Sequence, residues 1–208
     1  MTRNVTAHDV YNYVKERLIE KELFPGMQIV EEELAKVMQT SRTTVRSAIM
    51  RLHYEGFVTM IPNRGAFIAK PTETDMNSVY SLRRVLETEA VRLAINKLTE
   101  DDIRAMEDAL VRQRNLYHKY TPGKYIKLNT EFHWIVVEAA ENEYLEKFLG
   151  ELFNKSAIFL TFYDRSTSNA DSIATHQDLV DALKARDLEA AIAAVNADID
   201  CAVECIQL

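Results

Sequence analysis

Two arginines and two threonines stand together at the start of a predicted helix, directly after a serine. They are Arg42, Thr43, Thr44 and Arg46, and the serine is Ser41. An arginine side chain offers a planar fork of donors that matches a guanine edge or a phosphate group. Threonine hydroxyls and the free amide groups of a first helical turn can hold a phosphate. These residues indicate contact with nucleic acid, and the alternative is that they form an ordinary solvated helix face.

The helices that must position this cluster can be predicted from apolar spacing. Apolar residues recur with helical period over about residues 8–23, and a short helix is expected over 31–38. After a turn, Ser41 can cap a third helix, which runs to Glu55 and ends before Gly56. That helix carries an apolar stripe that must pack on the preceding helices: Val45, Ala48, Ile49 and Leu52.

Two strand-like runs follow, over residues 57–61 and 65–69, and the turn between them predicts a hairpin. Helix, helix–turn–helix and hairpin together are the plan of a winged helix domain over residues 1–70. Arg64 and Gly65 lie at the hairpin tip, where they can reach the minor groove or the DNA backbone. Because the turn, the cap, the arginines and the hairpin coincide, DNA binding is favoured over a solvated face.

The same segments resemble the DNA-binding domain of GntR-family bacterial transcription regulators. The matching runs are 41–48, 51–52, 55–58 and 62–68. The resemblance implies that Arg42, Thr43, Thr44 and Arg46 contact bases and phosphates and that Gly65 enters the minor groove. Relatives often have an arginine or a neutral polar residue where this chain has Glu32, so no DNA contact is assigned to Glu32.

Residues 71–208 contain almost no strand signal and predict an all-helical bundle of about six helices. Pro71 marks the boundary, because proline disfavours helix at the residue before it. The helices are expected to begin near Thr72, Thr99, Pro122, Asn142, Ser168 and Asp187. The run from Leu82 to Glu87 resembles the ligand-sensing domain of the FadR-like branch of the family, known as the FCD type. The fold expected for the chain is thus mainly α, with a winged helix followed by a helical bundle.

A candidate metal site lies in this second part. Asn129 and His133 are four residues apart and share one face of a predicted helix. The resemblance adds His176 and also Asp198, which replaces a usual third histidine, while Asn129 replaces a usual aspartate. Two imidazoles with oxygen ligands can hold Zn²⁺, Ni²⁺ or Mn²⁺ and leave positions open for a further ligand. The alternative is that the histidines hydrogen-bond in a polar core pocket without a metal.

Arg83 is the candidate anchor for an effector, because a guanidinium binds a carboxylate through two hydrogen bonds. The resemblance implies a small organic acid, such as a sugar acid, a hydroxy acid or a dicarboxylate. The alternative is that Arg83 only pairs with Glu87, one helical turn further on.

The net charge of −7 seems to argue against a nucleic-acid partner, but it is unevenly spread. Residues 1–70 carry a net charge of +2, and residues 71–208 carry −9. The longest apolar run has six residues, Ala190–Val195, so no membrane span is expected. The two cysteines and the absence of an apolar leader fit a reducing, cytoplasmic setting.

These features predict an effector-responsive transcription regulator that binds a double-stranded DNA operator. Since a winged helix reads one half-site, a homodimer on a pseudo-palindrome is expected. The alternative is a metal-dependent helical-bundle enzyme with a basic docking module. That alternative is disfavoured, because the sequence lacks paired Glu-x-x-His motifs and Glu131 lies on a different helix face from Asn129 and His133.

Overall fold

A computed structural model of the chain describes residues 4–116, 121–165 and 170–208. The chain forms two compact units, Met1–Thr72 and Glu73–Leu208. Each unit is described separately below.

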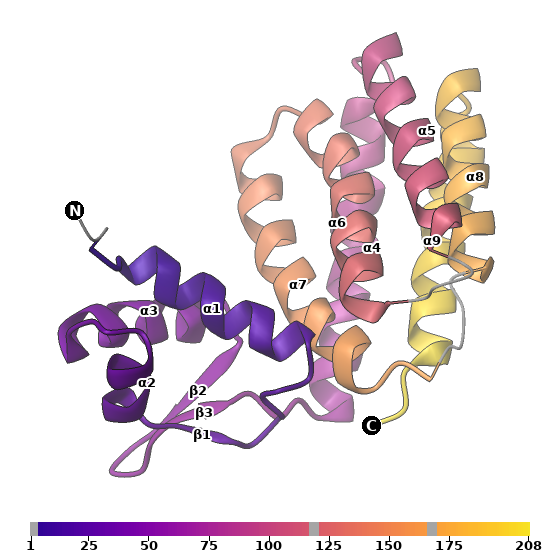
Figure 1. Ribbon diagram of the computed structural model, residues 1–208. Helices are drawn as coiled ribbons and strands as arrows, with labels where there is room; N and C mark the ends of the chain where they lie inside the picture. The colour runs from indigo at the N-terminus through magenta and orange to yellow at the C-terminus, as the bar shows by residue number, and fades with distance from the viewer. Residues whose placement is uncertain (1–3, 117–120, 166–169) are drawn as a thin grey trace. The chain divides into compact units, whose positions relative to one another are not determined.

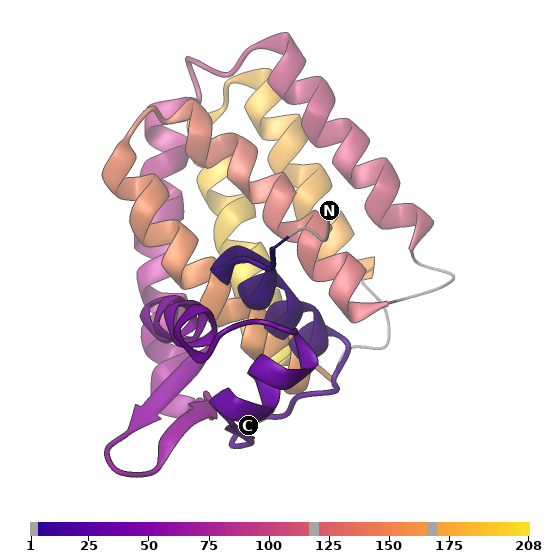
Figure 2. The ribbon, with the colours of Figure 1, turned by 60° about the vertical axis from the view of Figure 1, so that its left-hand side comes forward.

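The first unit has the winged helix plan (Figure 1). Its helices are α1 (Ala7–Ile19), α2 (Glu31–Val37) and α3 (Arg42–Tyr54). Its strands are β1 (Gln28–Ile29), β2 (Val58–Ile61) and β3 (Gly65–Ile68), which form an antiparallel sheet in the order β1-β3-β2. Figure 2 shows the β2–β3 hairpin extended beside the three helices.

Two details of this unit differ from the sequence prediction. Helix α1 ends at Ile19 rather than near residue 23, because the backbone turns at Lys21, whose φ of 57° cannot continue a right-handed helix. Strand β1 was not predicted, because two residues are too few to show an alternating pattern.

In the interior of the first unit α1 and α3 pack on each other, and α2 and the sheet also contribute buried side chains. The predicted apolar stripe of α3 is confirmed: Val45, Ala48, Ile49 and Leu52 are all buried. Burial of this stripe leaves the opposite face of α3, which carries the arginines, in solvent.

The second unit is a bundle of six helices within the described residues, as predicted (Figure 1). They are α4 (Glu73–Ala94), α5 (Glu100–Asn115), α6 (Pro122–Ala139), α7 (Glu143–Phe162), α8 (Ala170–Ala185) and α9 (Leu188–Cys205). Thr99, Asn142 and Asp187 cap their helices through side-chain oxygens, as their sequence positions suggested. The predicted start at Ser168 lies outside the described residues.

The helices of this bundle bury apolar side chains together with a small set of polar ones. The buried polar groups of the second unit include Arg83 and Glu87 on α4, His133 on α6, His176 on α8 and Asp198 on α9. Burying charged groups is costly unless they are paired, so these side chains need one another as partners. None of the helices in the described residues is long and apolar enough to cross a membrane.

Candidate functional site

The predicted DNA-contacting residues lie at the start of α3. The Ser41 side chain accepts a hydrogen bond from the Thr44 backbone amide at 3.1 Å, which confirms the predicted cap. The side chains of Arg42 and Arg46 are 63% and 65% exposed, and Thr43 is exposed as well. Thr44 is half-buried, and its hydroxyl lies 2.8 Å from that of Ser41. Both arginines are therefore accessible to a ligand from solvent.

Both arginines face an acid that the sequence analysis did not single out. Arg46 donates two hydrogen bonds to the carboxylate of Glu31 on α2, at 3.1 and 2.8 Å, and the guanidinium of Arg42 lies 4.0 Å from the same carboxylate. The hydrogen bond from Arg46 lowers the pKa of Glu31. The sequence carries one hint of this pair, since α2 must pack beside α3 for the helix–turn–helix to form.

Arg64 and Gly65 lie at the turn between β2 and β3, as predicted. Gly65 has a φ of +97°, which favours glycine. The Gln28 side chain donates a hydrogen bond to the Arg64 carbonyl oxygen at 2.8 Å, so the hairpin is tied to β1. The Arg64 guanidinium lies over the Phe67 ring, 5.4 Å from its centre, and the residue is exposed.

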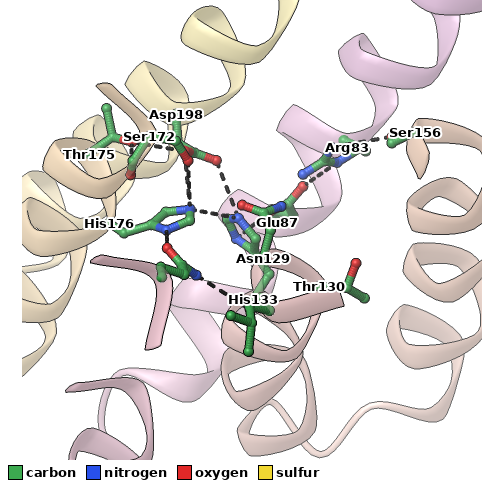
Figure 3. A network of polar contacts seen from close by, with 12 residues as sticks. Arg83, Glu87, Asn129, Thr130, His133, Ser156, Ser172, Thr175, His176 and Asp198 are labelled. Atoms are coloured by element: carbon green, nitrogen blue, oxygen red, sulfur yellow. Dashed lines mark hydrogen bonds and ion pairs between the residues drawn. The ribbon is translucent and has the colours of Figure 1, made fainter. Parts of the chain in front are cut away.

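In the second unit, three of the four predicted metal ligands meet at one point (Figure 3). The Nε2 atoms of His133 and His176 are 3.2 Å apart. The Asp198 carboxylate oxygens lie 3.3 Å from Nε2 of His133 and 3.2 Å from Nε2 of His176. Ligands bound at about 2.0–2.1 Å around a tetrahedral Zn²⁺ are separated by roughly 3.3–3.4 Å. The triangle of donor atoms has the size that such an ion requires.

The outer nitrogens of both imidazoles have acceptors. Nδ1 of His176 lies 2.9 Å from the side-chain oxygen of Gln113, and Nδ1 of His133 lies 3.3 Å from the Glu87 carboxylate. The Gln113 amide nitrogen donates to the Leu128 carbonyl oxygen at 3.4 Å, which fixes the orientation of the amide. With Nδ1 protonated on both rings, the Nε2 lone pairs converge toward Asp198. Sequence reasoning missed Gln113, which lies on a different helix and far from the histidines in sequence.

Burial and charge act in opposite directions on this cluster. Burial lowers the pKa of His176, against the pull of Asp198, so the neutral imidazole is favoured. Burial alone would raise the pKa of Asp198, but the positive charge of His176 when protonated, together with hydrogen bonds from both imidazoles, holds it well below its usual range. Asp198 also accepts hydrogen bonds from Thr175 at 2.8 Å and Ser172 at 3.3 Å. Neutral imidazole and ionised carboxylate are the protonation states that bind a metal.

The fourth predicted ligand, Asn129, lies on α6 one turn before His133. Its side-chain oxygen accepts a hydrogen bond from the Tyr125 hydroxyl at 3.2 Å, and the Tyr125 hydroxyl also hydrogen-bonds with Ser172. Asn129 lines the pocket described next, and its role as a metal ligand stays a prediction. Glu131 lies away from the site, since it forms ion pairs with Arg112 and Lys127.

Arg83 connects the cluster to a small pocket. Its Nε donates to the Glu87 carboxylate at 2.7 Å, and its Nη1 donates to the Ser156 hydroxyl at 3.2 Å (Figure 3). Its guanidinium also lies over the Phe153 ring at 4.9 Å. The predicted alternative pairing with Glu87 is therefore present. Arg83 also lines a pocket of about 50 Å³ together with Asn129 and Asp198, so pairing with Glu87 does not exclude contact with a ligand.

Comparison with known proteins finds one family match in each of the two units. Residues 6–68 match the family "Bacterial regulatory proteins, gntR family", and residues 78–200 match the FCD domain. The chain belongs to the GntR family and carries an FCD domain. FCD domains are associated with metal binding, in agreement with the possible His/His/Asp site.

Individual relatives agree with the family assignment. The chain is 38% identical to the Nta operon transcriptional regulator of Aminobacter aminovorans over 59% of this chain and 58% of that protein. It is 30% identical to YdhC, an uncharacterized HTH-type transcriptional regulator of Bacillus subtilis, over 67% of this chain and 62% of that protein. The matched region spans about three fifths of these relatives.

A solved structure, E. coli McbR/YncC, shares the fold. It has a TM-score of 0.82 at 22% identity and covers 94% of this chain and 93% of its own. The relatives are named as regulators, so the expectation of a regulator rather than an enzyme is confirmed at the level of the family.

Proposed function

We propose that this chain is a DNA-binding transcription regulator that binds a pseudo-palindromic operator as a homodimer and responds to a small carboxylate effector. The exposed arginines at the start of α3 and the hairpin with Arg64 and Gly65 support the DNA-binding part. Thr43 and Thr44 complete the predicted contact surface. A dimer follows from the economy of reading two half-sites with two copies of one winged helix.

The response to an effector rests on the buried cluster. The observation that carries it is the convergence of two imidazole nitrogens and one carboxylate, 3.2–3.3 Å apart, each held by a partner outside the triangle. This donor set fits Zn²⁺, Ni²⁺ or Mn²⁺. A bound divalent cation would supply open coordination positions for effector oxygens.

The protein's own groups hold and orient the site. Gln113 and Glu87 keep the two histidines in the orientation that aims Nε2 inward, and Arg83 adds a buried positive charge beside the pocket. The effector changes operator occupancy only if it binds one conformation of the regulator more tightly than another. We propose that the effector binds in this pocket and that the pocket binds it more tightly in one of the two conformations.

Selection of bound DNA from a random pool tests the operator. We expect one palindromic sequence, and we expect small carboxylic acids with Zn²⁺ present to change its affinity. Recovery of no preferred sequence by the full chain would contradict the proposed function. An operator that no acid affects would contradict the effector part alone.

Zinc titration tests the metal. We expect Zn²⁺ to raise the melting temperature of the wild-type chain and to have little effect on Asp198→Asn, which keeps the side-chain shape but removes the charge. His176→Gln is the second ligand variant, and Asn129→Ala tests the fourth ligand. His53→Gln is the matched control, because His53 hydrogen-bonds with the Val58 carbonyl in the first unit. Equal zinc binding by Asp198→Asn, His176→Gln and wild type would contradict the site.

A further inference from the structure

The pocket beside the histidine cluster is polar at both ends, but the charges at its two ends differ. Its buried end is formed by Arg83 and Asp198. Toward the surface it is lined by Asp164, which is half-buried, and by Asp171, which is exposed. A volume of about 50 Å³ admits only a few non-hydrogen atoms without movement of side chains, so a ligand here is small or extends through the opening.

The buried end suits an anion. Arg83 is paired with Glu87, and Asp198 faces the two imidazoles. A divalent cation bound there would exceed the charge of Asp198 and leave the buried end positive. A ligand carboxylate can therefore lie at this end.

The outer end suits a cation. Asp164 and Asp171 both line it, and Asp171 is exposed. The neighbouring thiol of Cys201 adds no negative charge at neutral pH, because burial raises its pKa to about 12. Among the described residues that line the pocket Arg83 is the basic one, and it is buried whereas Asp171 is exposed. A second ligand carboxylate at the outer end would face like charges at close range, which is unfavourable.

We propose that the effector is a small amino-carboxylate, whose carboxylate lies toward Arg83 and the histidine cluster and whose ammonium group lies toward Asp164 and Asp171. This inference rests on the proposed function, because it assigns a ligand class to the same pocket. It differs from the sequence-based expectation, since a dicarboxylate or a hydroxy acid lacks the positive group. An aliphatic amine is protonated at neutral pH, so its charge matches the two aspartates.

Matched acids of equal length test the ligand class. The zinc-loaded full chain is titrated by calorimetry with glycine, β-alanine and 4-aminobutyrate, each against its hydroxyl counterpart: glycolate, 3-hydroxypropionate and 4-hydroxybutyrate. Succinate, which replaces the ammonium of β-alanine by a carboxylate, completes the set. We expect at least one amino-carboxylate to bind ten or more times as tightly as its hydroxyl counterpart, and succinate to bind more weakly than β-alanine.

Substitutions at the outer end connect this preference to the structure. Asp171→Asn and Asp164→Asn are expected to reduce the preference for the amine over its hydroxyl counterpart to less than threefold. Asp178→Asn is the matched control, because Asp178 is exposed on the same helix as Asp171 and does not line the pocket. The control is expected to keep the full preference.

The possible failures are distinguishable. If hydroxy acids or succinate bind as tightly as every amino-carboxylate, the ligand class is wrong and the proposed function stands. If the preference survives in both aspartate variants, the placement of the ammonium group is wrong. If no acid of either kind binds or changes operator affinity, the proposed effector response fails together with this inference.

Discussion

The two units each contain an arginine–glutamate ion pair, and the two pairs differ in burial. In the first unit, Arg46 and Glu31 are joined by two hydrogen bonds, and the arginine side chain is 65% exposed. In the second unit, Arg83 and Glu87 are 2.7 Å apart with side chains only 4% and 5% exposed. The same chemistry therefore has two consequences. The exposed arginine can exchange its carboxylate for a phosphate, while the buried arginine cannot leave its partner without a large cost.

The largest effect is expected from breaking the buried pair. Arg83→Met leaves Glu87 without its guanidinium partner, and such a change lowers the free energy of unfolding by about 3–5 kcal/mol. Urea unfolding can be followed by the fluorescence of Trp134, which is the one tryptophan of the chain and lies in the second unit. The double variant Arg83→Met/Glu87→Met removes both charges and is expected to recover most of the loss. A loss below about 1 kcal/mol in the single variant would show that the pair behaves like an exposed one.

The exposed pair should affect DNA binding rather than stability. Arg46→Met is expected to weaken operator binding by roughly 5- to 150-fold, the range for one lost base contact, and to leave the free energy of unfolding close to that of the wild type. Fluorescence anisotropy with labelled operator measures the affinity, and circular dichroism measures the stability. Arg104→Met is the control, because Arg104 is an exposed arginine that pairs with acids of α5 in the second unit. Unchanged operator affinity in Arg46→Met would remove this residue from the interface.

The smallest effect is expected from the acid of the exposed pair. Glu31→Gln removes a negative charge next to Arg42 and Arg46, so binding to random-sequence DNA should tighten by about two- to fivefold at low salt. Glu32→Gln is the matched control on the same helix, since Glu32 pairs with Lys36 and contacts neither arginine in the described residues. If both variants behave alike, Glu31 does not compete with phosphate for the two arginines.

The sequence predicts the first unit better than the site in the second unit. The reason is the number of residues that separate contacting side chains in the sequence, which is smaller in the first unit. The arginine-bearing helix, its serine cap and its apolar stripe are encoded within fifteen residues, so local rules find them. Glu31, eleven residues before Arg42, was missed because its contact depends on how α2 packs on α3. The two-residue strand β1 was missed because its pairing with β3 is tertiary.

In the second unit, helix-period spacing predicted the six helices, and the family resemblance supplied His176 and Asp198. In the structure His176 on α8 and Asp198 on α9 lie close to His133 on α6. Gln113 and the contact of Glu87 with His133 could not be predicted, because each depends on the rotation of one helix relative to another. The same holds for the acidic outer end of the pocket, because Asp164 lies just after α7 and Asp171 lies at the start of α8.

Helix α4 has a mechanical consequence that follows from where it begins. Its first residue, Glu73, directly follows the end of the first unit, and Arg83 lies about 15 Å further along the same helix. A helix of this length is a stiff rod, because every turn is tied to the next by backbone hydrogen bonds. A rotation of α4 at Arg83 would therefore reach Glu73 along the helix itself, and residues 69–72 then connect α4 to β3. Arg83, which lines the pocket, and Glu73, which follows the first unit, therefore belong to one continuous helix.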